Sequence, residues 1–129
     1  MNTQTKHVLI IEDEPDILEA MAEAVASAGY QTSTANNGEE GLAMAFEQHP
    51  DLILLDLVMP VMDGRQALKK LREDPWGKDA RVVVLTSMDD VENIASSHEY
   101  TIEDYIIKSH ASLDEILQKV RLALHASEH

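Results

Sequence analysis

Several polar residues of this 129-residue chain directly follow short apolar runs. They are Glu12 and Asp13 after residues 7–11, Asp56 after residues 52–55, Thr86 and Ser87 after residues 81–85, and Lys108 after residues 105–107. If the runs are parallel strands, their carboxyl ends share one edge of the sheet, where open α/β sheets bind their ligands. The pattern therefore predicts that three carboxylates, one or two hydroxyl groups and one ammonium group lie together.

This set of groups suits phosphoryl transfer. Three neighbouring carboxylates repel one another unless a cation lies among them, and Mg²⁺ is typically held by one or two carboxylates together with phosphate. A carboxylate beside such an ion can act as a nucleophile toward phosphorus. The ion, the ammonium group and a hydroxyl group can each bind one phosphoryl oxygen, and the reaction depends mainly on positioning and charge neutralisation.

The run from Leu52 to Leu55 is apolar at successive positions, which is typical of a strand buried on both faces of a parallel sheet. Pro60 and Gly64 follow, so the chain is expected to leave the sheet and turn there. Asp56 is therefore predicted at the carboxyl end of a central strand.

The other elements alternate along the chain. We expect strands at residues 7–11, 30–35, 52–55, 81–85 and 105–107, and helices at residues 15–28, 39–49 and 64–72, from residue 89, and at residues 113–124. The helix at 39–49 should turn Leu42, Ala43 and Phe46 inward, with Gly41 as a mild cost. The last helix should bury Leu113 and Leu122 among its apolar residues. Strict alternation with short connections predicts a parallel α/β sheet with right-handed crossovers.

Composition limits the classes of function. The length suits one domain, expected at residues 6–124, with a flexible start at residues 1–5 and a short tail at residues 125–129. The formal net charge of −14 disfavours direct binding to nucleic acid. The chain has no cysteine, which excludes disulfides and thiolate metal sites. With no signal peptide or membrane-spanning run visible, we expect a cytoplasmic protein without membrane contact.

The strand-end residues occur within a longer set of motifs. These are Glu12-Asp13-Glu14-Pro15, Asp56 with Met59-Pro60 and Met62-Asp63-Gly64, Thr86-Ser87, and Tyr105-Ile106-Ile107-Lys108. In this order, the motifs resemble those of the receiver domain of two-component response regulators over about residues 6–124. The resemblance implies a flavodoxin-like three-layer sandwich, with a five-stranded parallel sheet in the order 2-1-3-4-5 and five helices.

The resemblance also implies a phosphoacceptor signalling switch rather than an enzyme, although such domains can catalyse their own phosphorylation and dephosphorylation. By resemblance, Asp56 is the phosphoacceptor. The resemblance gives Mg²⁺, or Mn²⁺ as a substitute, four ligands, which are Glu12, Asp13, Asp56 and the backbone carbonyl of Val58. It also implies that Thr86 and Lys108 contact the phosphoryl group and that Thr86 and Tyr105 form the switch pair. The implied partner is a sensor histidine kinase or a histidine phosphotransfer protein. The implied signalling face, which can also form a phosphorylation-dependent homodimer, combines the helix from residue 89, the fifth strand and the last helix.

Some residues depart from the family pattern. Ser109 follows Lys108 where the family usually has a proline with a cis peptide bond, so this bond is either trans or held cis at a cost of about 3 kcal/mol. Thr101 and Ile102 replace the common Gly-Ala pair, and we expect the segment 89–104 to be irregular or mobile. Apolar Val58 and Met88 stand where many relatives have polar groups, and we expect them to slow hydrolysis of the phosphorylated state.

Two other functions stay open from the sequence. A receiver-like module could act by docking alone without cycling phosphate, and a Mg²⁺-dependent phosphohydrolase could use Asp56 as its nucleophile. Single residues also have simpler explanations, because Glu12 and Asp13 could only favour a helix N-terminus and Tyr105 could be a packing residue. The intact set of acids, Thr86 and Lys108 favours the switch.

Overall fold

The computed structural model describes residues 5–57, 62–86, 102, 104–108 and 111–125. Its elements in chain order are β1 (His7–Ile11), α1 (Pro15–Ser27), β2 (Gln31–Ala35), α2 (Gly38–Gln48), β3 (Leu52–Asp56), α3 (Gly64–Arg72), the 3₁₀ turn η1 (Gly77–Asp79), β4 (Val82–Thr86), β5 (Asp104–Ile107) and α5 (Leu113–His125). The five predicted strands are all present, within one residue of their expected ends. Four α-helices are found in the described part of the chain.

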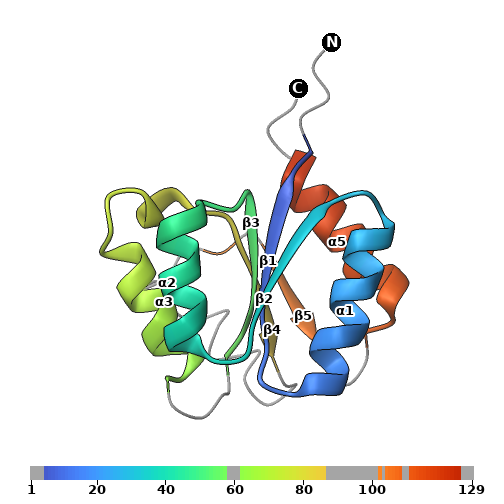
Figure 1. Cartoon of the computed structure of the whole chain (residues 1–129), viewed down its shortest axis with the longest axis horizontal. Coiled ribbons are helices and arrows are strands. Elements are labelled where there is room, and N and C mark those ends of the chain that lie inside the picture. Colours follow the sequence, from blue (N-terminus) through green and yellow to red (C-terminus); the bar gives the residue numbers. More distant parts are fainter. Residues whose placement is uncertain (1–4, 58–61, 87–101, 103, 109–110, 126–129) are drawn as a thin grey trace.

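The strands form one parallel sheet in the order β2-β1-β3-β4-β5, which confirms the predicted fold class and strand order. Helices α1 and α5 cover one face of the sheet, and α2 and α3 cover the other (Figure 1). Strand β3 lies between β1 and β4, and all five of its residues are buried. The uninterrupted apolar run therefore has the expected cause, since both faces of this strand meet helices.

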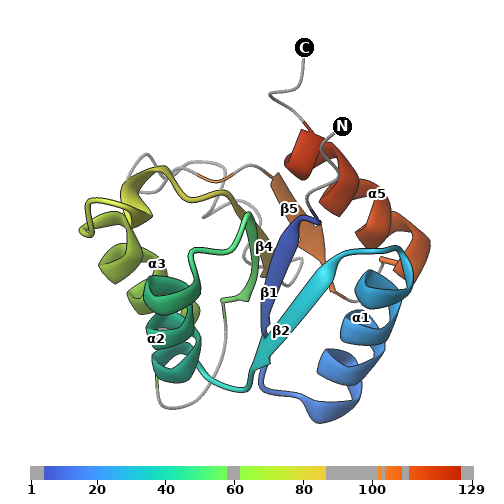
Figure 2. The ribbon, with the colours of Figure 1, turned by 45° about the horizontal axis from the view of Figure 1, so that its top comes forward.

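Alternating residues of the strands divide the core into two clusters. Val8, Ile10, Leu52 and Leu54 face α1 and α5 in one cluster. Leu9, Ile11, Ile53 and Leu55 belong to the other cluster, on the side of α2 and α3. The turned view shows both helical layers against the twisted sheet (Figure 2). This packing fixes the strands, and hence the residues at their carboxyl ends, on both sides.

The predicted inward face of α2 is right for Leu42, which packs against the core, and wrong for Ala43 and Phe46. Ala43 and Phe46 are exposed, Leu42 is half-buried, and the buried positions are Gly38, Gly41 and Ala45. A Cβ atom on Gly41 would lie 2.4 Å from Ile11 Cδ1, so the glycine lets α2 approach β1 closely. The small residues, together with the partly buried Leu42 and Met44, form the contact face.

Two residues of the last helix were also placed wrongly. Leu113 and Leu122 have 44% and 62% of their surface exposed. Helix α5 instead buries Ile116, Val120, Ala123 and Leu124. These four recur at spacings of four, three and one residues, which keeps them on one face, whereas Leu122 lies on the opposite side of the helix.

Several other predictions fall outside the described residues. They concern the helix from residue 89, the irregular segment before β5, the Lys108–Ser109 peptide bond, and the backbone and side chains at Val58 and Met88. Every helix within the described ranges is too short or too polar to span a lipid bilayer.

Candidate functional site

Asp56 is the last residue of the central strand β3, and its side chain is only 2% exposed. Its neighbour across the β4 ladder is Leu85, so Asp56 lies level with the end of the next strand. The Lys108 ammonium nitrogen lies 3.1 Å from Asp56 Oδ2, in hydrogen-bond contact. This contact joins the ends of β3 and β5 across β4, as the strand-end pattern predicted.

Glu12 and Asp13 follow β1, the neighbour of β3 on its other side. Glu12, Asp13 and Asp56 each offer a carboxylate oxygen, and these three oxygens lie within 4.8 Å of one another. Glu12 is fully buried, whereas Asp13 is partly exposed. The backbone N–H of Glu14 donates to Glu12 Oε2 over 3.1 Å. Three carboxylates are therefore gathered at the carboxyl edge of the sheet.

Lys108 is the cation among these acids. Its Nζ atom lies 3.0 Å from Glu12 Oε1 and 3.2 Å from Glu12 Oε2, in addition to its contact with Asp56. Burial by itself would lower the pKa of Lys108, but hydrogen bonds to Glu12 and Asp56 and their charges outweigh burial and raise that pKa above its ordinary value. The lysine is therefore firmly protonated in this setting.

Burial is the main cause of the raised pKa of Glu12. Removal of its carboxyl group from water raises the pKa of Glu12 from 4.5 to about 7, although the Glu14 N–H and Lys108 act in the opposite direction. The charge of Asp56 raises it further. Glu12 therefore carries a proton over part of the neutral pH range when only Lys108 balances the cluster.

The residues present fit a divalent cation. Among the described residues, none donates a hydrogen bond to the buried Oε1 atom of Glu12, although the Lys108 ammonium lies 3.0 Å away. A buried polar oxygen without a hydrogen bond is costly, and a cation can satisfy it. The donor set consists of carboxylate oxygens, which suits a hard ion such as Mg²⁺. Glu12, Asp13 and Asp56 are the residues that could hold it.

Thr86 and Tyr105 lie on neighbouring strands close to the cluster. Thr86 ends β4, is 1% exposed, and accepts a hydrogen bond from the Lys108 backbone N–H at its carbonyl oxygen over 2.9 Å. Tyr105 lies in β5 opposite Val84 and is half-buried. The roles assigned to these two residues stay predictions. Val58 and Met88, the remaining predicted residues, are not among those described.

Two features of the site were not predicted. Glu14 Oε1 lies 3.7 Å from Lys108 Nζ, so a third acid faces the lysine from the start of α1, and the run of three acids was its only sequence signal. The second is the close approach of α3 to β3, since a Cβ atom on Gly64 would lie 2.2 Å from the Asp56 carbonyl oxygen. Gly64 therefore sets how closely the start of α3 can pack beside the carboxylate cluster.

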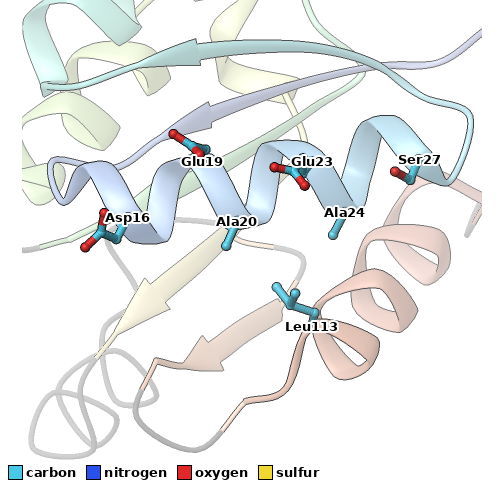
Figure 3. Close-up of a pocket in the computed structure, with 7 residues that line it drawn as sticks. All are labelled: Asp16, Glu19, Ala20, Glu23, Ala24, Ser27 and Leu113. Carbon is cyan, nitrogen blue, oxygen red and sulfur yellow. The ribbon is translucent and has the colours of Figure 1, made fainter.

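A groove runs along α1, on the side that faces α5 (Figure 3). It has a volume of about 390 Å³, and Ala20 and Ala24 of α1 face Leu113 of α5 across it, with Asp16, Glu19, Glu23 and Ser27 along the helix (Figure 3). A second pocket of about 260 Å³ borders it, shares Asp16, Ala20 and Leu113, and is also lined by Lys108. An acidic surface with an apolar floor therefore leads from α1 toward Lys108.

Comparison with known proteins adds independent information. A family model described as the response regulator receiver domain matches residues 8–121. The chain is 32% identical over 121 residues to the DNA-binding dual master transcriptional regulator RpaA of Synechocystis, covering 94% of this chain and 50% of that protein. It is 34% identical over 122 residues to the regulatory protein AtoC of Escherichia coli, covering 95% of this chain and 26% of that protein. The chain thus spans half or less of the length of these curated relatives.

Solved structures of receiver domains have the same fold as this chain. The fold matches a CheY-like response regulator receiver domain protein from Methanospirillum hungatei with a TM-score of 0.86 and 26% identity, over 97% of this chain and 98% of that one. It matches the chemotaxis protein CheY4 of Vibrio cholerae with a TM-score of 0.85 and 26% identity, over 94% of this chain and 100% of that one. The residues that the family model matches, 8–121, include nearly the whole sheet and the edge that carries the acids. The chain therefore belongs to the family of response regulator receiver domains, the regulatory signalling domains of two-component systems.

Proposed function

We propose that this domain is a phosphorylation-driven switch whose phosphoacceptor is Asp56. One observation carries the proposal: a buried carboxylate at the end of the central strand touches one ammonium group and shares its site with two further carboxylates. Family membership supports the same reading. The phosphoryl donor in this proposal is a phosphohistidine of a sensor histidine kinase or of a histidine phosphotransfer protein.

In the proposed reaction, one Asp56 carboxylate oxygen attacks phosphorus and forms an O–P bond. The N–P bond of the phosphohistidine breaks, and its electron pair returns to the imidazole nitrogen, which then takes a proton. Lys108 holds the Asp56 carboxylate in place beforehand and offers its ammonium group to the phosphoryl oxygens afterwards. Thr86 would donate its hydroxyl proton to one of those oxygens. Mg²⁺ held by Glu12, Asp13 and Asp56 would supply neutralising positive charge, and the Val58 carbonyl is a further proposed ligand.

The proposed signal travels from Thr86 to Tyr105. Movement of the Thr86 side chain toward the phosphoryl group would leave room for the Tyr105 ring to turn inward. A ligand shifts such an equilibrium only by its different affinity for the two states, so these side chains must make different contacts in each state. The surface that would change comprises β5, α5 and the segment before β5, and it is also the proposed face for homodimer formation.

The electrostatic character of the domain suits a protein partner. The groove along α1 carries Asp16, Glu19 and Glu23 beside an apolar floor, close to Lys108. A partner with basic and apolar residues could rest there while it presents its phosphohistidine to Asp56. The net charge of −14 argues against direct contact with nucleic acid by this domain. In the longer relatives, any DNA binding belongs to those proteins as a whole.

Incubation with acetyl phosphate and Mg²⁺, followed by intact-mass measurement, tests the proposal. The wild-type domain should gain one phosphoryl group, and Asp56→Asn should gain none. Asp51→Asn is a matched control, because Asp51 is an exposed acid at the opposite end of β3 and should leave the gain unchanged. No gain by the wild type would support a docking module. Release of phosphate from many equivalents of donor with no phosphorylated protein detected at any time would support a hydrolase, and either result would overturn the proposal.

A further inference from the structure

Lys119 of α5 reaches two consecutive residues of the edge strand β5. Its Nζ atom lies 2.9 Å from Asp104 Oδ2 and 5.6 Å from the centre of the Tyr105 ring. Asp104 Oδ1 accepts the backbone N–H of Tyr105 over 2.8 Å. One carboxylate therefore holds both the backbone of Tyr105 and the ammonium group that lies over its ring.

The contact between Lys119 and the ring restricts how Tyr105 can move. A cation attracts an aromatic ring only within about 6 Å of the ring centre, so the observed distance is near the limit. Side-chain rotamers about χ1 differ by about 120°, and a change of rotamer therefore carries the ring by several ångströms. Lys119 cannot follow the ring freely, because Asp104 holds its ammonium group. A turned ring would lose the contact.

We propose that Lys119 is a positioning residue that, together with Asp104, holds Tyr105 in the rotamer of the unphosphorylated domain. This proposal rests on the proposed function, in which Tyr105 turns inward after phosphorylation. Because a turned ring would lose the contact, the contact favours the observed rotamer and opposes the switch. Lys119 and Asp104 are 28% and 40% exposed, so the bias is small, about two- to fivefold in the ratio of the rotamers.

The test compares Lys119→Gln with Lys119→Arg. Glutamine removes the positive charge, whereas arginine keeps a cation that can pair with Asp104 and lie over the ring. Lys78→Gln is a control for the change in net charge, because Lys78 lies in the exposed turn η1. Three-bond couplings of the Tyr105 β protons, measured by NMR, report the χ1 populations and do not respond to the mere loss of a nearby charge.

In the unphosphorylated proteins, Lys119→Gln should change the ratio of Tyr105 rotamers by about two- to fivefold, toward the ratio that wild type reaches with acetyl phosphate and Mg²⁺. Lys119→Arg and Lys78→Gln should keep the wild-type ratio, and Asp104→Asn should change it in the direction of Lys119→Gln. Identical couplings in Lys119→Gln and wild type would overturn the proposal, as would an equal change in Lys119→Arg.

The same samples separate this proposal from the proposed function. If wild type gains no phosphoryl group by intact mass, the proposed function fails, but the couplings of the unphosphorylated proteins still show whether Lys119 holds the ring. If wild type is phosphorylated and its Tyr105 couplings stay unchanged, the role of Tyr105 in the switch is refuted, and the proposal for Lys119 fails with it.

Discussion

Replacement of Glu12 by glutamine should stabilise the domain in the absence of metal, and the gain should increase with pH. The reason is the raised pKa of Glu12, which is fully buried and shares its site with Asp56. A carboxyl group whose pKa is higher in the folded protein contributes stability that is fully present below its unfolded pKa. That stability is lost as pH rises through the folded pKa. Glutamine carries no ionisable proton, so the variant avoids this loss.

The magnitude follows from the two pKa values of Glu12, 4.5 in the unfolded chain and about 7 in the folded domain. Proton linkage gives a loss from this group of about 1 kcal/mol at pH 5 and about 3 kcal/mol at pH 8, relative to pH 4 and below. The difference in unfolding free energy between Glu12→Gln and wild type should therefore grow by about 2 kcal/mol between pH 5 and pH 8. Acids remote from the cluster titrate in both proteins, so the difference reports Glu12 together with the charged groups that it contacts.

Urea unfolding at several pH values measures this difference, and the single tryptophan, Trp76, provides the fluorescence signal. Trp76 stacks on His49 with ring centres 4.3 Å apart, so unfolding changes its surroundings. Glu19→Gln is the control for the change in net charge, because Glu19 is an exposed acid on α1. Saturating Mg²⁺ should stabilise wild type more than Glu12→Gln, by about 3 kcal/mol at a hundredfold excess over the dissociation constant if the variant does not bind. A difference that stays flat or falls with pH would refute the reasoning.

Three further predictions concern packing, a helix end and the lifetime of the phosphorylated state. Gly64→Ala should lower the unfolding free energy by about 2–3 kcal/mol, because the added methyl group meets rigid backbone. Gly41→Ala should lower it less, because its methyl group meets the flexible side chain of Ile11. Midpoints of urea unfolding measure both effects. Arg81→Gln should lower the unfolding free energy by about 1–2 kcal/mol and speed hydrogen exchange in the last turn of α5, because the Arg81 guanidinium donates to two carbonyl oxygens there. Arg121 lies on the exposed side of α5, so Arg121→Gln should have neither effect. Val58→Asn should speed phosphate release from the phosphorylated domain if an apolar group excludes the attacking water, and an unchanged release rate would contradict this.

The strands and their order were predictable because apolar runs and their punctuation are local signals. Strand β3 is apolar at successive positions, and the structure buries all of them. The inward face of α2 was only partly predictable from hydrophobicity, because α2 packs through Gly41 and Ala45 as well as Leu42 and leaves Phe46 exposed. Close approach of two backbones favours small residues, and a search for large apolar residues finds the wrong face in such a helix.

The convergence of the acids and Lys108 was predictable because each of these residues lies at or just after the carboxyl end of a strand, and parallel strands end at one edge. The contacts that long side chains make with distant elements were not predictable in the same way. Lys119 meets Asp104 across 15 positions of sequence, and Arg81 reaches the end of α5 across 42. Such contacts depend on rotamers and on the angle at which a helix crosses the sheet, and neither is encoded in a local pattern.

The charges of the cluster link its stability to its proposed chemistry. The cluster holds the carboxylates of Glu12, Asp13 and Asp56 and one ammonium group, so it has an excess of negative charge when all four groups are ionised. Burial of the Glu12 carboxyl group disfavours its charged form, the charge of Asp56 adds to this, and the raised pKa of Glu12 reflects both effects. The same excess makes the site attractive to a divalent cation and unattractive to a phosphoryl group that arrives without one. A change that relieves the repulsion, such as Glu12→Gln, should therefore stabilise the metal-free fold while it weakens the binding of the ion on which the proposed phosphorylation depends.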